Sequence, residues 1–515
     1  MRGKNSILNI ISNLFVIILQ IALVFVVRFI FVKVLNEQYL GIQGLFTNII
    51  SMLSLAELGI GTAISFILYK PLADKDYNKV SVIVTFLRKV YIAIGIVVLI
   101  AGFIITPFLK YIVTGYTMGN LSIIFIIYFI TLAVEYFLTY PETLLNADQK
   151  HYKISFILIG YTLITNVLQI IALLVTKNFL IYIIADVIMK LVKFVAINIY
   201  VKKYYPKVNF YSKEKLEKEE KNKFTKNVKS LFLYKIGDYL INGTDNIIIS
   251  KIIDISTVGV YSNYLSTITI FRNIMNNIIS GVTASFGNLI VKENEKIQKN
   301  VFNIMNFITY IFCGFVFCCL MFLFNDFIKI FYGENYILGM TEVIIICLNF
   351  YIAAMLLPLE SVKNAAGLYY EDRYVTIIQA IINVVISIVL GRKIGLIGVL
   401  IGTFASYILT TVWERPIIIY KKIFKSNSSE YFKKYFIQII MILFNIGIDW
   451  LIINKLFTEI SIINFILKGV IIFMIFMITN IIIYKNSKEF NYIYETILSK
   501  LKIMKNKRME KQEDE

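Results

Sequence analysis

The sequence predicts an all-α polytopic membrane protein with about fourteen transmembrane helices, and three observations lead to this fold class. Hydrophobic residues make up 58% of the 515-residue chain, and the mean hydropathy is +0.74. A soluble protein of this length could not bury that much apolar surface. Apolar runs long enough to cross a bilayer recur from end to end. These runs lack the strict alternation of barrel strands and are too long for them.

The expected helices follow from these runs, because each crossing needs ~20 apolar residues. The predicted spans are residues 9–34, 41–68, 83–109, 121–140, 154–175, 180–201, 230–253, 258–290, 301–325, 341–360, 375–394, 396–420, 435–454 and 461–484. The first run lacks a small-residue cleavage site, so we interpret it as a span and not as a removed signal peptide.

The charges lie between the apolar runs, and they predict the orientation. The chain carries 52 Lys and Arg residues against 33 Asp and Glu residues, a net charge of +19. If the N-terminus is inside, most of the basic residues fall in cytoplasmic segments, as the positive-inside rule requires. We therefore expect a multi-pass protein of the bacterial cytoplasmic membrane with both termini in the cytoplasm. This distribution does not form a nucleic-acid-binding face, so no nucleic-acid partner is expected.

A basic loop divides the chain into two parts that resemble each other. "GTAISF" at 61–66 is similar to "GVTASF" at 281–286, and "YPETLLNADQKHY" at 140–152 is similar to "LPLESVKNAAGLYY" at 357–370. This repeat predicts two six-helix lobes with a cleft between them, as in transporters. The expected segments are the N-terminal lobe 1–201, the linker 202–229, the C-terminal lobe 230–420, two further helices within 435–484 and the tail 485–515. We expect the linker and the tail to be either amphipathic helices on an anionic leaflet or solvated basic segments.

Ionisable residues inside the spans are the candidate site residues. Glu57 lies near the middle of an apolar run, where a carboxylate costs roughly 2.5–3.5 kcal/mol. Lys235, Asp238 and Asp245 step along one face of the seventh span, and such faces should border water. We predict that Glu57, Asp238, Asp245 and Glu135 couple ion movement to transport. The alternative is that these carboxylates only brace neighbouring helices.

Several strings resemble the polysaccharide transporter, or oligosaccharide flippase, family of the multidrug/oligosaccharidyl-lipid/polysaccharide exporter superfamily. They are "LGIQGLFTNIISMLSLAELGIGTAISFILYKPLADKD", "LLNADQKHYKI", "GTDNIIISKIID" and "VGVYSNY". The resemblance covers residues 1–430, with two helices added. It implies a V-shaped pair of lobes, alternating access, and transfer of an undecaprenyl-diphosphate-linked oligosaccharide to the outer leaflet for surface polysaccharide assembly.

The resemblance also implies a site for the diphosphate. In the related lipid II flippases, arginines on the first, second and eighth helices line the cavity, and Arg28 and Arg272 match two of them. The second helix offers Glu57 and no arginine, which departs from that pattern. Together with Lys235, Arg28 and Arg272 are the predicted cavity residues for substrate. The expected partners are the lipid-linked oligosaccharide, membrane lipids, and a polysaccharide polymerase or glycosyltransferases.

Other function classes fit the sequence less well. The predicted outer loops are too short for an enzyme that acts on a surface polymer, and no phosphate-binding loop of a primary pump occurs. We therefore predict a protein that is not an enzyme and that uses no cofactor or metal. A cation-coupled multidrug antiporter of the same superfamily and a lipid II flippase remain the alternatives. Basic side chains in the cavity favour an anionic lipid-linked cargo over a cationic drug.

Overall fold

The computed structural model describes most of the chain. The described residues are 23–53, 64, 67–68, 70–72, 74–148, 154–218, 221, 224–225 and 243–496. Within these ranges the secondary structure is helical and no strand occurs, which confirms the all-α fold class. The chain divides into two compact units. Unit 1 comprises Met1–Asn263 and Val384–Val399, and unit 2 comprises Tyr264–Asn383 and Leu400–Glu515.

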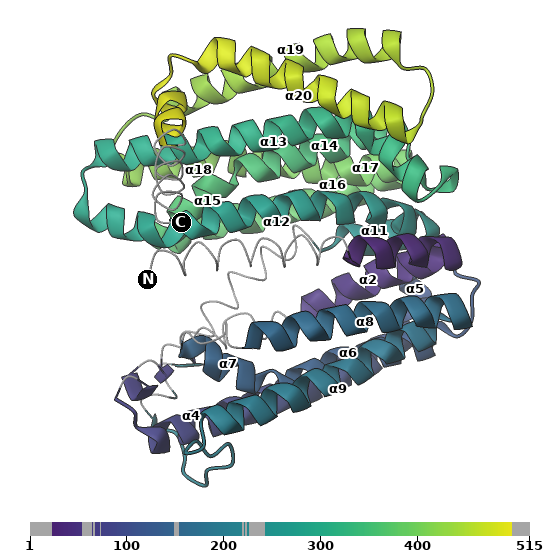
Figure 1. Ribbon diagram of the computed structural model, residues 1–515, viewed down its shortest axis with the longest axis vertical. Helices are drawn as coiled ribbons and strands as arrows, with labels where there is room; N and C mark the ends of the chain where they lie inside the picture. Colours follow the sequence, from purple (N-terminus) through teal and green to yellow (C-terminus); the bar gives the residue numbers. More distant parts are fainter. Residues whose placement is uncertain are drawn as a thin grey trace, which may run out of the picture. The chain divides into compact units, whose positions relative to one another are not determined.

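Unit 1 is built from packed antiparallel helices (Figure 1). Its elements are α2 (Glu37–Leu53), α4 (Tyr77–Ile105), η2 (Thr106–Phe108), α5 (Leu109–Ile112), α6 (Leu121–Leu138), α7 (Tyr140–Ala147), α8 (Ser155–Thr176), α9 (Phe179–Tyr204), α11 (Asp245–Ile252) and the start of α12 (Ile255–Lys292). The pairs α8 with α9, α4 with α6, and α6 with α9 pack most extensively. Three buried phenylalanine rings pack together in this unit, with Phe46 on α2 and Phe125 and Phe129 on α6.

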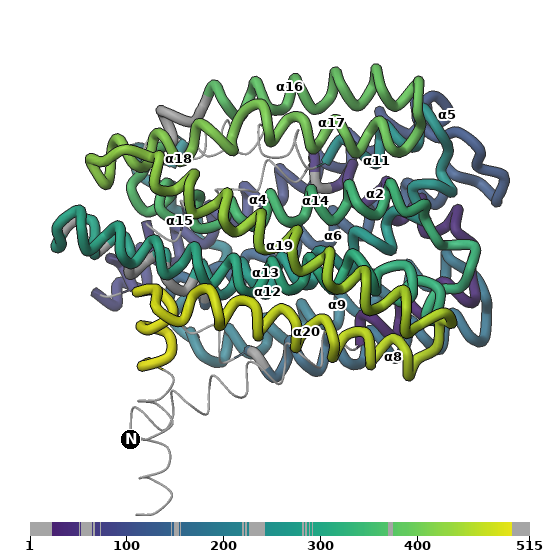
Figure 2. The backbone as a smooth tube through the Cα atoms, turned by 90° about the horizontal axis from the view of Figure 1, so that it is seen from above, coloured from purple at the N-terminus to yellow at the C-terminus, as the bar shows by residue number. Residues whose placement is uncertain are grey.

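Unit 2 contains the longest helices and the two additional C-terminal ones. Its elements are the rest of α12, α13 (Glu295–Phe331), η4 (Glu334–Tyr336), α14 (Met340–Met355), α15 (Leu357–Ala366), most of α16 (Tyr369–Ile394) and α17 (Leu396–Leu409), α18 (Thr411–Lys422), α19 (Ser429–Leu456) and α20 (Ile462–Tyr484). Helices α19 and α20 lie side by side, and α20 packs along α13 (Figures 1 and 2). Lys468 on α20 joins this interface by donating a 2.7 Å hydrogen bond to Asp326 on α13.

Nine helices of the described residues are long and apolar enough to span a membrane, so the protein is a multi-pass membrane protein. Helices α9 and α12 are also longer than one bilayer crossing, at 26 and 38 residues, but they carry more charged and polar residues. Several predicted spans fall partly or wholly outside the described residues. The count of fourteen and the lobe boundaries therefore stay predictions.

The two segments of the proposed repeat adopt the same local structure. Helices α7 and α15 are both short, and each has a proline, Pro141 or Pro358, as its second residue. Proline suits the first turn because its missing N–H would have no partner there. Glu142 on α7 pairs with Lys193 on α9 at 3.1 Å, and Glu360 on α15 pairs with Arg415 on α18 at 2.5 Å.

Helix α2 meets the start of α12 at backbone contact within unit 1. A Cβ atom added to Gly41 would lie 1.9 Å from the carbonyl oxygen of Ile255, and one added to Gly259 would lie 2.0 Å from that of Glu37. Side chains are normally too large for such an approach, so the two glycines let the helices touch. They therefore hold α2, which carries part of the candidate site, against α12.

The start of the linker differs from the two predicted alternatives. Residues 205–217 are not helical, and residues 209–212 within this largely exposed segment are bound to the start of α4. Ser81 accepts a hydrogen bond from the backbone N–H of Asn209 at 2.8 Å, and Thr85 accepts one from Ser212 at 3.0 Å. These hydroxyls accept from backbone N–H groups that would donate to carbonyl groups of the same segment if the linker were helical here. The Tyr205 hydroxyl donates a hydrogen bond to the Asp148 carboxylate, and burial, followed by this hydrogen bond, raises the pKa of Tyr205.

Candidate functional site

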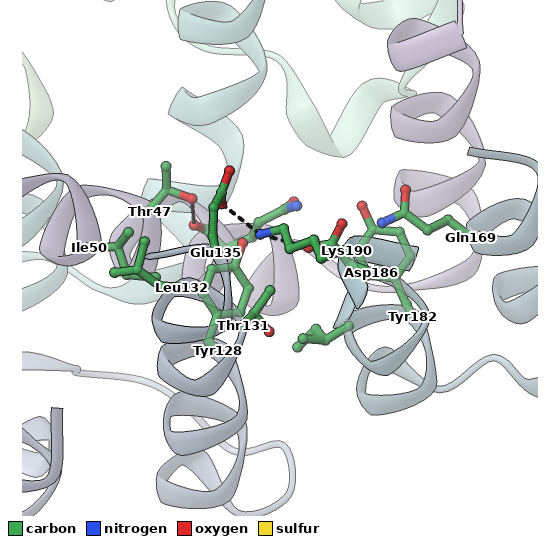
Figure 3. Close-up of a pocket in the computed structure, with 12 residues that line it drawn as sticks. Thr47, Ile50, Tyr128, Thr131, Leu132, Glu135, Gln169, Tyr182, Asp186 and Lys190 are labelled. Carbon is green, nitrogen blue, oxygen red and sulfur yellow. Dashed lines mark hydrogen bonds and ion pairs between the residues drawn. The ribbon is translucent and has the colours of Figure 1, made fainter. Parts of the chain in front are cut away.

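A polar pocket of about 260 Å³ opens between α2, α6, α8 and α9 in unit 1 (Figure 3). Its apolar wall includes Ile50, Leu132 and Ile183. The polar residues that line it are Gln43, Thr47, Tyr128, Thr131, Glu135, Gln169, Tyr182, Asp186 and Lys190. On α2, α6 and α9 they recur at helical spacing, so each of these helices turns one polar face toward the same space, and α8 adds Gln169.

A triad of charged side chains occupies this pocket. Lys190 Nζ lies 3.0 Å from Glu135 Oε2 and 3.3 Å from Asp186 Oδ2. The Lys190 side chain is 16% exposed, whereas Glu135 is 46% exposed, so the ammonium group lies deeper than the carboxylate. Two carboxylates and one ammonium leave the triad one negative charge in excess. Such an arrangement can take up one proton or one cation without burying a net charge.

Arg28 lies next to the pocket on the helix formed by residues 23–34. Its guanidinium donates to Asn263 Oδ1 at 3.0 Å and to Ser262 Oγ at 2.7 Å, both on α12. One turn further along, Phe31 packs edge-on against Tyr182, which lines the pocket, with ring centroids 5.3 Å apart. Arg28 is therefore held by α12 beside the wall of the pocket in unit 1.

Unit 2 contains a cluster of mainly basic side chains, which we call the basic cluster. It consists of Arg272, Lys363 and Arg415 around Glu360. Arg415 bonds Glu360 directly, and Lys363 and Arg272 both interact electrostatically with the same carboxylate. Lys363 is 2% exposed and Arg415 is 7% exposed. Among the residues that the structure describes, three cations gather around this one carboxylate in a mostly buried setting. Such a site favours an anion with several acceptor oxygens, because arginine forks bind these groups in pairs.

The structure brings some of the predicted site residues into these two places. Glu135 lies in the pocket of unit 1, Arg28 lies beside it, and Arg272 belongs to the basic cluster. Asp245 is buried at the first turn of α11, where the helix N-terminus favours a carboxylate. The candidates Glu57, Lys235 and Asp238 lie outside the described residues.

The sequence did not predict how either group is completed. Lys190 joins Glu135 to Asp186. Its spacing of four from Asp186 is the one signal that could have paired those two. No local pattern links Lys363 to Arg415, because they lie on different helices and meet only through the fold.

The comparisons with known proteins agree with this architecture. The model of the family described as "Polysaccharide biosynthesis protein" matches residues 30–341. No curated protein sequence matches the chain closely enough to count as a relative.

Solved structures of membrane transporters share the fold. The lipid II flippase MurJ in an inward closed conformation superposes with a TM-score of 0.68 at 17% identity, covering 93% of this chain and 99% of that one. An inward-facing multidrug resistance MATE family transporter of the MOP superfamily has a TM-score of 0.61 at 13% identity and covers 77% and 93% of the two chains. A Vibrio cholerae MATE transporter has a TM-score of 0.52 at 12% identity and covers 79% and 95%.

Proposed function

Because the chain belongs to the polysaccharide biosynthesis protein family, we propose that it is a flippase for an undecaprenyl-diphosphate-linked oligosaccharide. It moves this cargo from the inner to the outer leaflet of the bacterial cytoplasmic membrane by alternating access, with both termini in the cytoplasm. The transported unit then enters surface polysaccharide assembly, where a polymerase or glycosyltransferases use it. The observation that carries the proposal is the basic cluster of unit 2, which suits the anionic part of such a cargo.

The diphosphate binds at the basic cluster. In the unloaded protein, Glu360 occupies part of this site by accepting a hydrogen bond from Arg415. A diphosphate carries more charge and more acceptor oxygens than one carboxylate, so it competes for Arg415 and Arg272. Arg28 and Lys235 remain proposed contacts for the same cargo.

The triad in unit 1 couples transport to a cation. Its excess negative charge is neutralised when Glu135 or Asp186 takes up a proton, or when a small cation enters the pocket. Either event loosens the hold of the carboxylates on Lys190, so the packing of α6 against α9 changes with the charge of the site. Glu57, Asp238 and Asp245 remain proposed as further coupling groups.

A multidrug antiporter is the second candidate, and the acidic excess of the unit 1 pocket favours it. Cationic drugs bind best to acidic and aromatic walls, and Tyr128 and Tyr182 supply such walls beside Glu135. The basic cluster argues against this function, because a cationic drug gains nothing from three cations. A lipid II flippase would use the same basic cluster, so the sugar unit alone distinguishes it from the proposed function.

Deletion of the gene tests the proposal. We expect loss of a surface glycan and accumulation of its lipid-linked precursor, measured by labelling intact cells and by mass spectrometry of extracted lipids. A plasmid copy carrying Arg415→Lys and Lys363→Gln should fail to restore the glycan while reaching normal protein levels. Lys421→Gln, on the exposed side of the same α18, is the matched control and should restore it. Normal glycan together with increased dye sensitivity would instead establish the antiporter.

A further inference from the structure

A second pocket of unit 1 lies where the linker meets α9, and we call it the linker pocket. It has a volume of about 300 Å³. Helix α9 contributes Phe194, Asn198 and Lys202, and the linker contributes Phe210 and Tyr211. The pocket therefore exists only while the linker is packed on the unit.

The linker pocket is basic and aromatic. Lys202 lines it, and the Arg88 guanidinium stacks on the Tyr211 ring with its carbon 4.1 Å from the centroid. Among the described residues that line this pocket there is no carboxylate. Glu142 on α7 pairs with Lys193, and Glu217 in the linker pairs with Lys79. The pocket thus offers one cation in its wall, a second stacked on its Tyr211 ring, and several ring faces to an anionic group.

An apolar stripe on α9 leads into the linker pocket. Ile188, Val192, Val195 and Ile199 follow one another at intervals of four, three and four residues, so they share one face of the helix. Each is more than half exposed, from 51% for Val192 to 64% for Ile199. Val195 and Ile199 also line the pocket. A ligand in the pocket therefore has a path for hydrocarbon along the membrane-spanning part of α9.

We propose that the linker pocket binds the headgroup of an anionic membrane phospholipid. The phosphate contacts Lys202 and Arg88, the polar headgroup lies among Tyr211 and Phe210, and the acyl chains follow the stripe on α9. The combination of cations with an exposed apolar stripe selects a lipid, because a soluble phosphate gains nothing from the stripe. Under the expected orientation this lipid belongs to the inner leaflet.

Lipid binding would also hold the linker in place. Phe210 and Tyr211 lie between Asn209 and Ser212, whose backbone groups are bound by Ser81 and Thr85 on α4. A headgroup between α9 and this segment adds contacts that exist only in the packed state. Anionic lipid therefore favours the packed linker by mass action.

The test uses the purified full-length protein with phosphatidylglycerol or phosphatidylcholine added in detergent. Binding is measured by native mass spectrometry, and linker packing by the rate of tryptic cleavage within residues 205–218. We expect phosphatidylglycerol to bind and to slow cleavage, and phosphatidylcholine to do neither. Lys202→Gln and Arg88→Gln should each weaken phosphatidylglycerol binding by about fivefold, the effect of one basic residue at an anionic membrane surface.

Lys203→Gln is the matched control, because Lys203 is adjacent on α9 and does not line the pocket. It should leave both lipid binding and the slowed cleavage intact. Equal weakening by Lys203→Gln would mean unspecific attraction to a basic surface and would overturn the proposal, as would full binding by the Lys202→Gln Arg88→Gln double variant. A competition with undecaprenyl diphosphate separates the two lipid sources. Displacement of phosphatidylglycerol at equimolar undecaprenyl diphosphate would assign the pocket to the cargo carrier and also refute the proposal.

Discussion

In the pocket of unit 1, a single ammonium group bridges two carboxylates that would otherwise repel each other. Lys190 contacts Glu135 and Asp186 at 3.0 and 3.3 Å, and all three side chains project into the same polar space (Figure 3). Glu135 is the more exposed of the two acids. Its contact with Lys190 attaches α6 to α9 at this level.

Glu135→Gln tests this role, because it preserves the shape of the side chain and an oxygen that can accept from Lys190. We expect transport to fall and to lose part of its pH dependence, while protein level changes little. The stability cost should stay near ~1 kcal/mol, since the pair is partly exposed. Lipid-linked precursor and surface glycan are measured in cells buffered at several pH values.

The matched control for this experiment is Glu142→Gln on α7, which removes the carboxylate that pairs with Lys193 on α9 and does not line the pocket. It should leave the pH dependence of transport unchanged. If Glu135→Gln transports like the unaltered protein at every pH, Glu135 is a structural brace only.

At the residue scale, a charge inside an apolar run pointed to Glu135, because an isolated carboxylate there is too costly to lack a partner or water. The structure places Glu135 in a polar pocket beside a cation, and its role in ion coupling stays a prediction. The same reasoning could not identify its partner, since Lys190 lies 55 residues away. Which cation meets which acid depends on the packing of α6 on α9, and single-helix periodicity does not contain that information.

At the scale of elements, the contact between α2 and α12 depends on two glycines, because each has only a hydrogen atom as its side chain. Gly41 and Gly259 have no side chains, so the backbone of each helix lies against that of the other. The contact joins the helix that supplies Gln43 and Thr47 to the pocket with the helix that holds Arg28. Any side chain at this contact would separate the two elements of the site.

Gly41→Ala should destabilise unit 1 by about 2–3 kcal/mol, because its Cβ cannot fit beside the Ile255 carbonyl and the helices must separate. The apparent melting temperature of the purified protein, followed by circular dichroism, measures this loss. Gly160→Ala, on α8 with no atom within 4 Å of the added Cβ, serves as control and should be neutral or stabilising by up to ~1 kcal/mol. An unchanged melting temperature for Gly41→Ala would contradict the close packing.

Elements were the scale at which the sequence was most informative. Long apolar runs predicted the helices, and the aligned Pro141 and Pro358 indicated two segments that proved to be short helices of the same kind. The linker was less predictable, because its lysines and glutamates are equally compatible with a helix or a solvated chain. Its packing depends on Ser81 and Thr85, which lie on a distant helix and carry no signal in the linker sequence.

For the whole molecule, each unit holds its own group of charged side chains. Among the described residues, the triad of unit 1 places two carboxylates around one ammonium group, and the basic cluster of unit 2 places three cations around one carboxylate. The C-terminal helices α19 and α20 add another buried charge contact, in which Lys468 and Asp326 are 9% and 10% exposed. This pair ties the additional helices to α13.

Lys468→Met should destabilise the packing of α20 on α13, because it leaves the Asp326 carboxylate buried without its cation. Losses of about 3–5 kcal/mol are typical when one partner of a buried pair is removed. The double variant Lys468→Met Asp326→Leu should recover most of the stability, since apolar groups can replace a buried pair. Both are compared by thermal unfolding in detergent, and a double variant no better than the single one would show that the pair itself is not the cause.

The three cations of the basic cluster have an electrical consequence for the proposed transport cycle. A bound diphosphate of about two negative charges would offset much of their charge, so the loaded site would respond less to the membrane voltage than the empty one. The empty cluster would still feel that field, which is worth ~2.3 kcal/mol per elementary charge for each 100 mV. A potential that is negative inside would therefore draw the empty, cationic site back toward the cytoplasm. Voltage would accelerate the return of the carrier and affect the outward step of the cargo less.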